Sequence, residues 1–342
     1  MSEADSEVTG VEAAQERPER ASSPGIVLAV ASMLWTAAML WSARVTITGH
    51  ANAEMEVTST AYAMPGAVSA SLVAGAAVGV AVRRYLTRGG REPGPTVRFA
   101  LPIGAGLAVG LLGALAIFTI NTEGWIYAVV AGTIAAAATI GGTLASFRHP
   151  RVIAAACGGA LAVFGVQALL SFAQDSLLPA LGAGNTAASQ ASAAGYFGFV
   201  QGALGGLAAG LVAYRLMRHA RRRGGSDVRW PLYALAGAGP GLLLIVSELL
   251  TRTAGARVLE LAGKVSELEL TVQRVLSGTR LNIGLVVLFV GAFTAMVAVG
   301  RTLGTPVAAT ESSPEPVSTA PSAPAQASPA QASDSVGTRK DD

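Results

Sequence analysis

Eight long apolar stretches, separated by short polar or basic segments, dominate the chain. A run of about 18 or more mostly apolar residues is long enough to cross a bilayer as a helix. A soluble protein with such helices in its core would need amphipathic helices around them, and the sequence offers almost none. The pattern predicts an all-α, polytopic membrane helix bundle of about eight transmembrane helices. These cover roughly residues 25–42, 62–82, 100–120, 125–146, 152–173, 194–217, 230–250 and 281–300.

The composition agrees with a membrane location. Hydrophobic residues make up 51% and charged residues 13% of the 342 residues, about half the charged fraction of an average soluble domain. Arginine outnumbers lysine 22 to 2, and the apolar stretches are rich in alanine and glycine. This usage is typical of a GC-rich bacterial genome, and it indicates the bacterial plasma membrane.

Arginine is concentrated in alternate connections between the spans. By the positive-inside rule these connections are cytoplasmic, and an even number of spans then places both termini there. The last external connection, 251–280, also carries basic residues and is the exception. The connections that set the orientation hold Arg83, Arg84, Arg88, Arg91 and Arg98 after the second span, Arg148 and Arg151 after the fourth, and Arg215, Arg218, Arg221, Arg222, Arg223 and Arg229 after the sixth.

The chain divides into a transmembrane domain, 25–303, and two polar ends. Residues 1–24 are acidic and lack apolar periodicity, which predicts a disordered cytoplasmic N-terminus. The length and acidity of this leader favour a membrane anchor over a cleaved signal peptide for the first span. Residues 304–342 form a Pro/Ala/Ser-rich tract, which predicts a disordered cytoplasmic tail.

One segment outside the spans has helical periodicity. We expect an extracellular amphipathic helix over 256–277, either lying on the outer leaflet or forming a coiled coil. The first arrangement is favoured, because the short connection before the segment could scarcely reach the far end of an upright helix. The apolar positions on its heptad are Val258, Leu261, Val265, Leu268, Val272 and Val275.

The sixth span carries glycine at every fourth position: Gly198, Gly202, Gly206 and Gly210. In water, glycine inside a helix costs about 1 kcal/mol relative to alanine. In lipid, helices associate through close packing, which small residues permit. The stripe therefore predicts a helix-packing face, and the sequence leaves open whether its partner belongs to the same chain or to a second copy.

A second group of residues suggests a polar pocket. Glu248 is the only carboxylate within the predicted spans, and ionisable groups inside the membrane often mark an ion or solute path. Pro240 interrupts the same span, and broken helices near the midplane are typical of transporter sites. Gln167 and Gln201 lie at a similar depth, where they would either line a pocket with Glu248 or form interhelical hydrogen bonds.

No catalytic, cofactor-binding or metal-ligating pattern accompanies these features. The three histidines have no second ligand at metal-binding spacing, and the single Cys157 allows no disulfide within the chain. The sequence predicts a non-enzymatic integral membrane protein without cofactor, in contact with the lipid bilayer and not with nucleic acid. An assembly or accessory role, as a homo-oligomer or with other membrane proteins, ranks first. The alternative is a small-solute permease with its site near Pro240 and Glu248.

Overall fold

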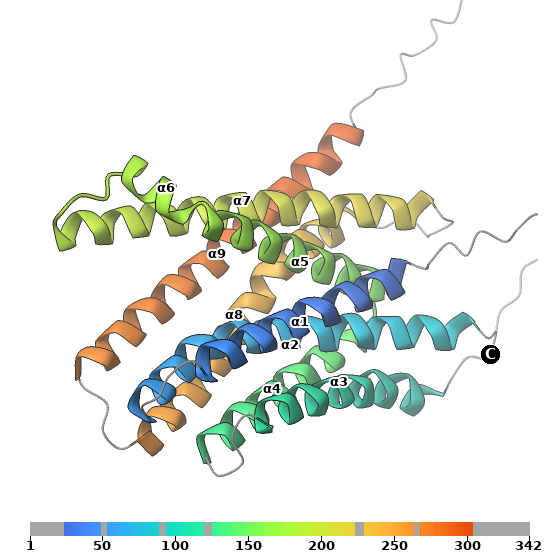
Figure 1. The fold of residues 1–342 in the computed structure, drawn as a ribbon. Helices are drawn as coiled ribbons and strands as arrows, with labels where there is room; N and C mark the ends of the chain where they lie inside the picture. The colour runs from blue at the N-terminus through green and yellow to red at the C-terminus, as the bar shows by residue number, and fades with distance from the viewer. Residues whose placement is uncertain are drawn as a thin grey trace, which may run out of the picture. The chain divides into compact units, whose positions relative to one another are not determined.

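The computed structural model describes residues 24–48, 53–88, 94–119, 125–222, 229–262 and 267–303. These ranges contain nine helices and no strand (Figure 1). Eight of the helices are long and apolar enough to cross a membrane. This confirms the predicted all-α polytopic bundle. The helices are α1 (Pro24–Thr48), α2 (Ala53–Arg88), α3 (Pro95–Phe118), α4 (Trp125–Ala145), α5 (Pro150–Phe172), α6 (Gln174–Ala180), α7 (Ala187–Arg222), α8 (Trp230–Ala262) and α9 (Glu267–Leu303).

Several helices are longer than the apolar stretches that predicted them. α2 and α7 have 36 residues each and α9 has 37, so each is about 55 Å long at 1.5 Å per residue. A hydrocarbon core is about 30 Å thick, and polar residues at the ends of these helices continue them beyond it. The short helix α6, in the connection between α5 and α7, has no counterpart in the sequence prediction. The predicted polar ends of the chain, 1–24 and 304–342, lie outside the described residues except for Pro24, the first residue of α1.

The amphipathic helix expected over 256–277 is a point where the structure corrects the sequence analysis. α8 continues to Ala262 and α9 begins at Glu267, so the segment is divided between two long membrane helices. The four residues between them lie outside the described ranges. α8 and α9 each extend beyond their apolar portions, and the apolar positions keep their helical spacing in these extensions. The sequence pattern therefore could not distinguish two extended helices from one separate helix.

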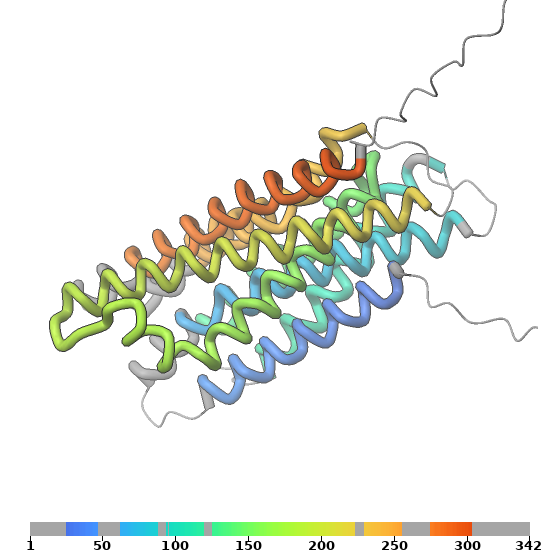
Figure 2. Tube along the Cα trace, turned by 90° about the horizontal axis from the view of Figure 1, so that it is seen from above, coloured from blue at the N-terminus to red at the C-terminus, as the bar shows by residue number. Residues whose placement is uncertain are grey.

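The membrane helices lie side by side in two groups (Figures 1 and 2). In the first group α2 packs against α1, α3 and α4. In the second, α7 packs between α5 and α9, and α8 packs against α9. The groups meet mainly where α8 contacts α2 and α4, with a further contact of α2 with α5. α8 thus connects the two halves of the bundle.

Small residues bring the helix backbones unusually close. A Cβ atom placed on Gly110 of α3 would lie 2.7 Å from the Ala135 Cα of α4. A Cβ atom on Gly79 of α2 would lie 2.8 Å from the Ala145 Cβ of α4. Real Cβ contacts are longer than this, so these helix pairs require glycine at the points where they touch. Close backbone approach is the form of packing expected between helices in lipid.

Candidate functional site

A cavity of about 280 Å³, here called the glutamate cavity, lies between the two groups of helices. Its walls come from α1 and α2 on one side and from α5, α8 and α9 on the other. The lining combines aromatic, serine and amide side chains with one carboxylate and one guanidinium group. The residues are Trp35, Met39, Pro65, Gly66, Ser69, Phe164, Gln167, Ala168, Ser171, Leu244, Ser247, Glu248, Arg280 and Ile283.

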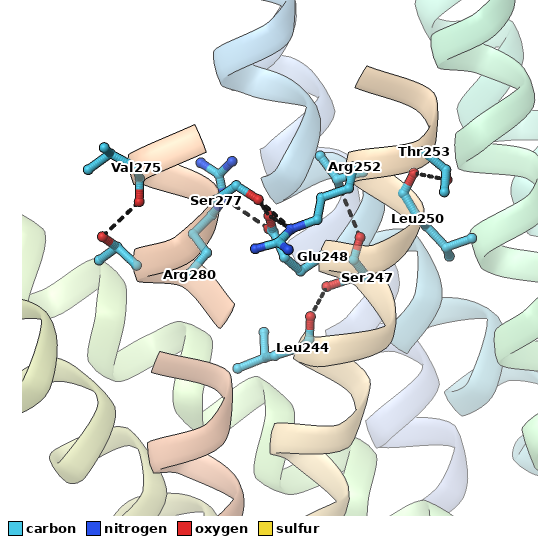
Figure 3. A network of polar contacts seen from close by, with 11 residues as sticks. Leu244, Ser247, Glu248, Leu250, Arg252, Thr253, Val275, Ser277 and Arg280 are labelled. Atoms are coloured by element: carbon cyan, nitrogen blue, oxygen red, sulfur yellow. Dashed lines mark hydrogen bonds and ion pairs between the residues drawn. The ribbon is translucent and has the colours of Figure 1, made fainter. Parts of the chain in front are cut away.

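Glu248 is the centre of a polar network that joins α8 to α9 (Figure 3). Its side chain is only 4% exposed. Arg280 Nε donates to Glu248 Oε2 at 3.0 Å, and the Ser277 hydroxyl donates to Glu248 Oε1. Arg252 Nε lies 3.5 Å from the same Oε1 and donates to Ser277 Oγ at 2.6 Å. The buried carboxylate is therefore paired and hydrogen-bonded, as a charge removed from water has to be.

The remaining polar groups of the glutamate cavity are less completely used. The hydroxyls of Ser69, Ser171 and Ser247 donate to carbonyl oxygens of their own helices at 2.8–3.0 Å. Their oxygens can still accept hydrogen bonds. The side-chain amide of Gln167 has no hydrogen bond to any described residue and offers both donors and an acceptor. On the apolar part of the wall, Trp35 and Phe164 stack with ring centroids 5.7 Å apart.

The structure brings together two of the four residues that the sequence proposed for a polar pocket. Gln167 and Glu248 line the glutamate cavity. Gln201 does not, although its Nε2 donates to the backbone oxygen of Gln167 at 3.5 Å. Pro240 is buried elsewhere in α8, which remains helical through it. A Cβ atom on Gly159 of α5 would lie 2.6 Å from the Pro240 Cγ, so this part of α8 is closely packed.

Four contributors to this site were missed from the sequence: Trp35, Phe164, Ser277 and Arg280. Arg280 stood one residue before the predicted span 281–300, and its carboxylate partner is 32 positions earlier in the chain. The position of Arg280 could have indicated its role, because a basic residue at the edge of an apolar span commonly pairs with a buried acid or a carbonyl group. Nothing in the sequence pairs the rings of Trp35 and Phe164.

A second cavity, the arginine cavity, has a volume of about 550 Å³ and opens at the other end of the helices. It is bounded by α2, α3, the connection 146–149, α5, α7 and α8. Six arginines and one histidine contribute to its wall, and none of its twelve lining residues is acidic. The lining consists of Arg83, Arg84, Thr87, Arg98, Arg148, His149, Pro150, Arg151, Val152, Met217, Arg229 and Leu232.

Arg83 is the most buried arginine of this cavity, with 5% of its side chain exposed. Its Nη1 donates to the backbone oxygens of Ala145 at 3.0 Å and Phe147 at 2.5 Å. Ala145 is the last residue of α4, and the final carbonyl groups of a helix lack partners within it. Arg83 therefore caps α4 from α2, using only one of its three nitrogen atoms.

The two cavities lie at opposite ends of the same three helices, α2, α5 and α8. Between them is a packed apolar region, here called the barrier. The barrier consists of Leu72, Val73, Ala76 and Ala77 of α2, Cys157 and Ala160 of α5, and Leu243 of α8. From Ser69 to Arg83 on α2, and from Val152 to Phe164 on α5, the helix rise gives a thickness of about 18–21 Å. The Cys157 side chain within it is 0% exposed.

The glycine stripe of α7 lies against α9 of the same chain. A Cβ atom on Gly206 would lie 2.8 Å from the Val290 Cβ, and one on Gly210 would lie 2.6 Å from the Gly291 oxygen. The question that the sequence left open, whether the stripe packs within one chain, is answered by these contacts for the chain described here.

Neither a metal site among the described residues nor a match to a known protein adds to this description. Among the described residues, no group of three or more His, Cys, Asp or Glu side chains could hold a metal ion. No protein-family model, no curated protein and no solved structure matches the chain. The functional argument therefore depends on the two cavities and on the barrier between them.

Proposed function

We propose that this membrane protein is a permease for a small polar solute, which passes between α2, α5 and α8. The observation that carries the proposal is the arrangement of the two cavities. Each opens at one end of the same three helices, and a barrier of about 20 Å separates them. A carrier requires a hollow on each side of the membrane and a closed segment between them that opens to one side at a time.

The composition of the barrier supports a movable closure. The barrier includes the small side chains of Ala76, Ala77 and Ala160, and beside it α5 and α8 touch through Gly159 against Pro240 and Gly239 against Ala156. Small side chains leave few interlocking contacts to be broken when two helices slide past one another. The closed segment lies at the junction of the two helix groups, where rigid-body movement of one group against the other would open it.

The glutamate cavity would provide the solute contacts at one end. The Gln167 amide offers donors and an acceptor, and the serine oxygens offer acceptors. The stacked rings of Trp35 and Phe164 provide an apolar surface beside them. This mixture suits a small solute with several polar groups, and the proposal includes no catalysis and no cofactor.

The assembly role that the sequence ranked first has less support. It was argued from the glycine stripe and from an outer amphipathic helix. The stripe is occupied by α9 within the chain, and residues 256–262 and 267–277 belong to α8 and α9. The stripe therefore has a partner within the chain, and no separate outer helix stands among the described residues.

The single native cysteine tests the permease proposal without knowledge of the solute. Cys157 lies in the barrier, so a small hydrophilic methanethiosulfonate reagent can reach it only when the barrier opens. In sealed vesicles of either orientation, we expect slow but complete labelling of Cys157 in the folded protein, because each side gains access in turn. Mass spectrometry of the intact protein measures the labelled fraction.

A control must separate opening of the path from general fluctuation of the bundle. Ala213 of α7 is also 0% exposed but lies in another cluster, with Val152 and Tyr233. The variant Ala213→Cys in a Cys157→Ala background should stay unlabelled over the same period. Equal labelling of the two positions, or labelling of neither, would refute the permease proposal.

A further inference from the structure

We propose that the arginine cavity binds a phosphate-bearing anion, supplied either as a free phosphate compound or as a phospholipid headgroup. The site goes beyond the permease function, because its occupation does not require that any solute cross the membrane. The inference rests on the charge of the cavity, on the unused donors of Arg83 and on the space available.

Among the described residues that line the cavity, basic side chains are concentrated and none is acidic. Six of its twelve lining residues are arginines, and His149 is a seventh basic side chain. Residues 150–152 at the start of α5 and residues 229 and 232 at the start of α8 also line it. A helix N-terminus carries partial positive charge and free N–H groups. The fields of side chains and helix ends therefore add, and they favour an anion inside the cavity.

Arg83 provides a buried and preorganised donor group. The two hydrogens of Nη1 are directed to the carbonyl oxygens of Ala145 and Phe147, which hold the guanidinium plane in place. Its Nε–H and both Nη2–H groups have no hydrogen-bond partner among the described residues. These atoms form the edge of the guanidinium fork that binds two oxygens of a phosphate at once. Among the described residues, only Ser71 Oγ and Tyr214 OH are buried side-chain atoms without a partner, so the free edge of Arg83 faces accessible space, where an anion can reach it.

The size and position of the cavity favour a phosphate compound over a simple halide. A volume of about 550 Å³ lies in the range of small-molecule sites, about 300–1,000 Å³. A phosphate group presents several strong acceptor oxygens to the guanidinium donors around it. The cavity also lies between membrane helices at their ends, and basic pockets at this position commonly receive lipid headgroups.

The test uses the whole chain and two pairs of substitutions that remove equal charge. Arg98→Gln with Arg151→Gln changes the cavity, and neither arginine side chain makes a hydrogen bond to a described residue. Arg215→Gln with Arg222→Gln changes α7 outside the cavity lining. Thermal unfolding is followed in non-ionic detergent during titration with inorganic phosphate, against sodium chloride of equal ionic strength. A ligand that binds only the folded state raises the unfolding temperature, and the titration yields an apparent affinity.

We expect phosphate to stabilise the unmodified chain, the cavity pair to weaken its apparent affinity about tenfold or more, and the α7 pair to change it less than twofold. Arg83→Gln should abolish the effect if that variant folds. The source of the phosphate is distinguished in nanodiscs of phosphatidylcholine with or without phosphatidylglycerol. Stabilisation by phosphatidylglycerol alone, lost in the cavity pair, identifies a headgroup site.

Two results would overturn the inference. One is the absence of stabilisation by both inorganic phosphate and phosphatidylglycerol. The other is an equal loss of affinity in both pairs of substitutions, which would indicate attraction to the surface charge in general. Cys157 labelling does not enter this measurement, so phosphate binding in a chain whose barrier never opens would retain this site and reject the permease.

Discussion

The four glycines of α7 that face α9 should respond differently to the same substitution by alanine. At Gly198, the new Cβ atom would lie 3.6 Å from the Thr279 Cγ2, an ordinary contact. At Gly210, it would lie 2.6 Å from the Gly291 oxygen and 2.7 Å from the Thr294 Cβ. A backbone oxygen cannot turn away as a side chain can, so the helices would have to separate.

The magnitude follows from two opposing contributions. Replacing glycine by alanine inside a helix gains up to about 1 kcal/mol, and overpacking a close contact costs about 1–3 kcal/mol. For Gly198→Ala only the gain applies, and we expect the free energy of unfolding to stay equal or to rise by as much as about 1 kcal/mol. For Gly210→Ala the cost dominates, and we expect a net loss of about 1–2 kcal/mol.

The positions between them should complete a gradient. A Cβ atom would lie 3.2 Å from the Val286 Cβ at Gly202 and 2.8 Å from the Val290 Cβ at Gly206, so the loss should increase along the helix from Gly202 to Gly206. At Gly195, also in α7, a new Cβ atom would meet nothing within 4 Å. Gly195→Ala therefore measures the helix propensity alone.

The assay is reversible unfolding in mixed micelles with increasing dodecyl sulfate, followed by circular dichroism. Each variant is compared with Gly195→Ala, so that only the contact with α9 differs. If Gly210→Ala is as stable as Gly198→Ala, then α7 and α9 do not approach as closely as described, and the argument from their backbone distance is wrong.

Two further predictions concern orientation and the buried carboxylate. In a chain without its native cysteine, an impermeant thiol reagent on intact cells should label Ser192→Cys and spare Ser226→Cys, because the arginine-rich connections are expected to be cytoplasmic; reversed labelling would invert the topology. In a double-mutant cycle of unfolding, Glu248→Gln and Arg280→Gln should show a coupling free energy of about 1–3 kcal/mol. The pair of Glu248 with Arg252, which is 41% exposed, should show less than about 1 kcal/mol. Equal coupling free energies of the two pairs would contradict this ranking.

The number and positions of the membrane helices could be predicted from the sequence because they depend on local composition. Each predicted span corresponds to one described helix, and the differences lie at the ends. Polar residues extend α2, α7 and α9 beyond their apolar portions, where helix propensity and neighbouring helices decide the boundary rather than hydrophobicity. For the same reason, the sequence analysis interpreted the polar extensions of α8 and α9 as one separate helix.

The candidate site could be predicted only in part, and the reason lies in the solvent. In water, a polar face and an apolar face reveal which side of a helix is buried. In lipid, both the core face and the lipid face are apolar, so periodicity does not indicate that Gln167 lines a cavity and Gln201 does not. The pairing of Glu248 with Arg280 depends on the approach of α8 to α9, and it becomes visible only in three dimensions.

The central position of α8 has a consequence for synthesis of the chain. α8 is the seventh membrane helix to emerge, and its first residue comes 142 positions after the last residue of α2. At about 5–20 residues per second, the ribosome needs about 7–28 s to add them. α3 and α4 are completed within this interval. For the rest of it, α1 to α4 can make their contacts with one another, while the surface that will receive α8 remains open. A stop codon anywhere before Trp230 would thus release a product without either cavity, because both include residues of α8.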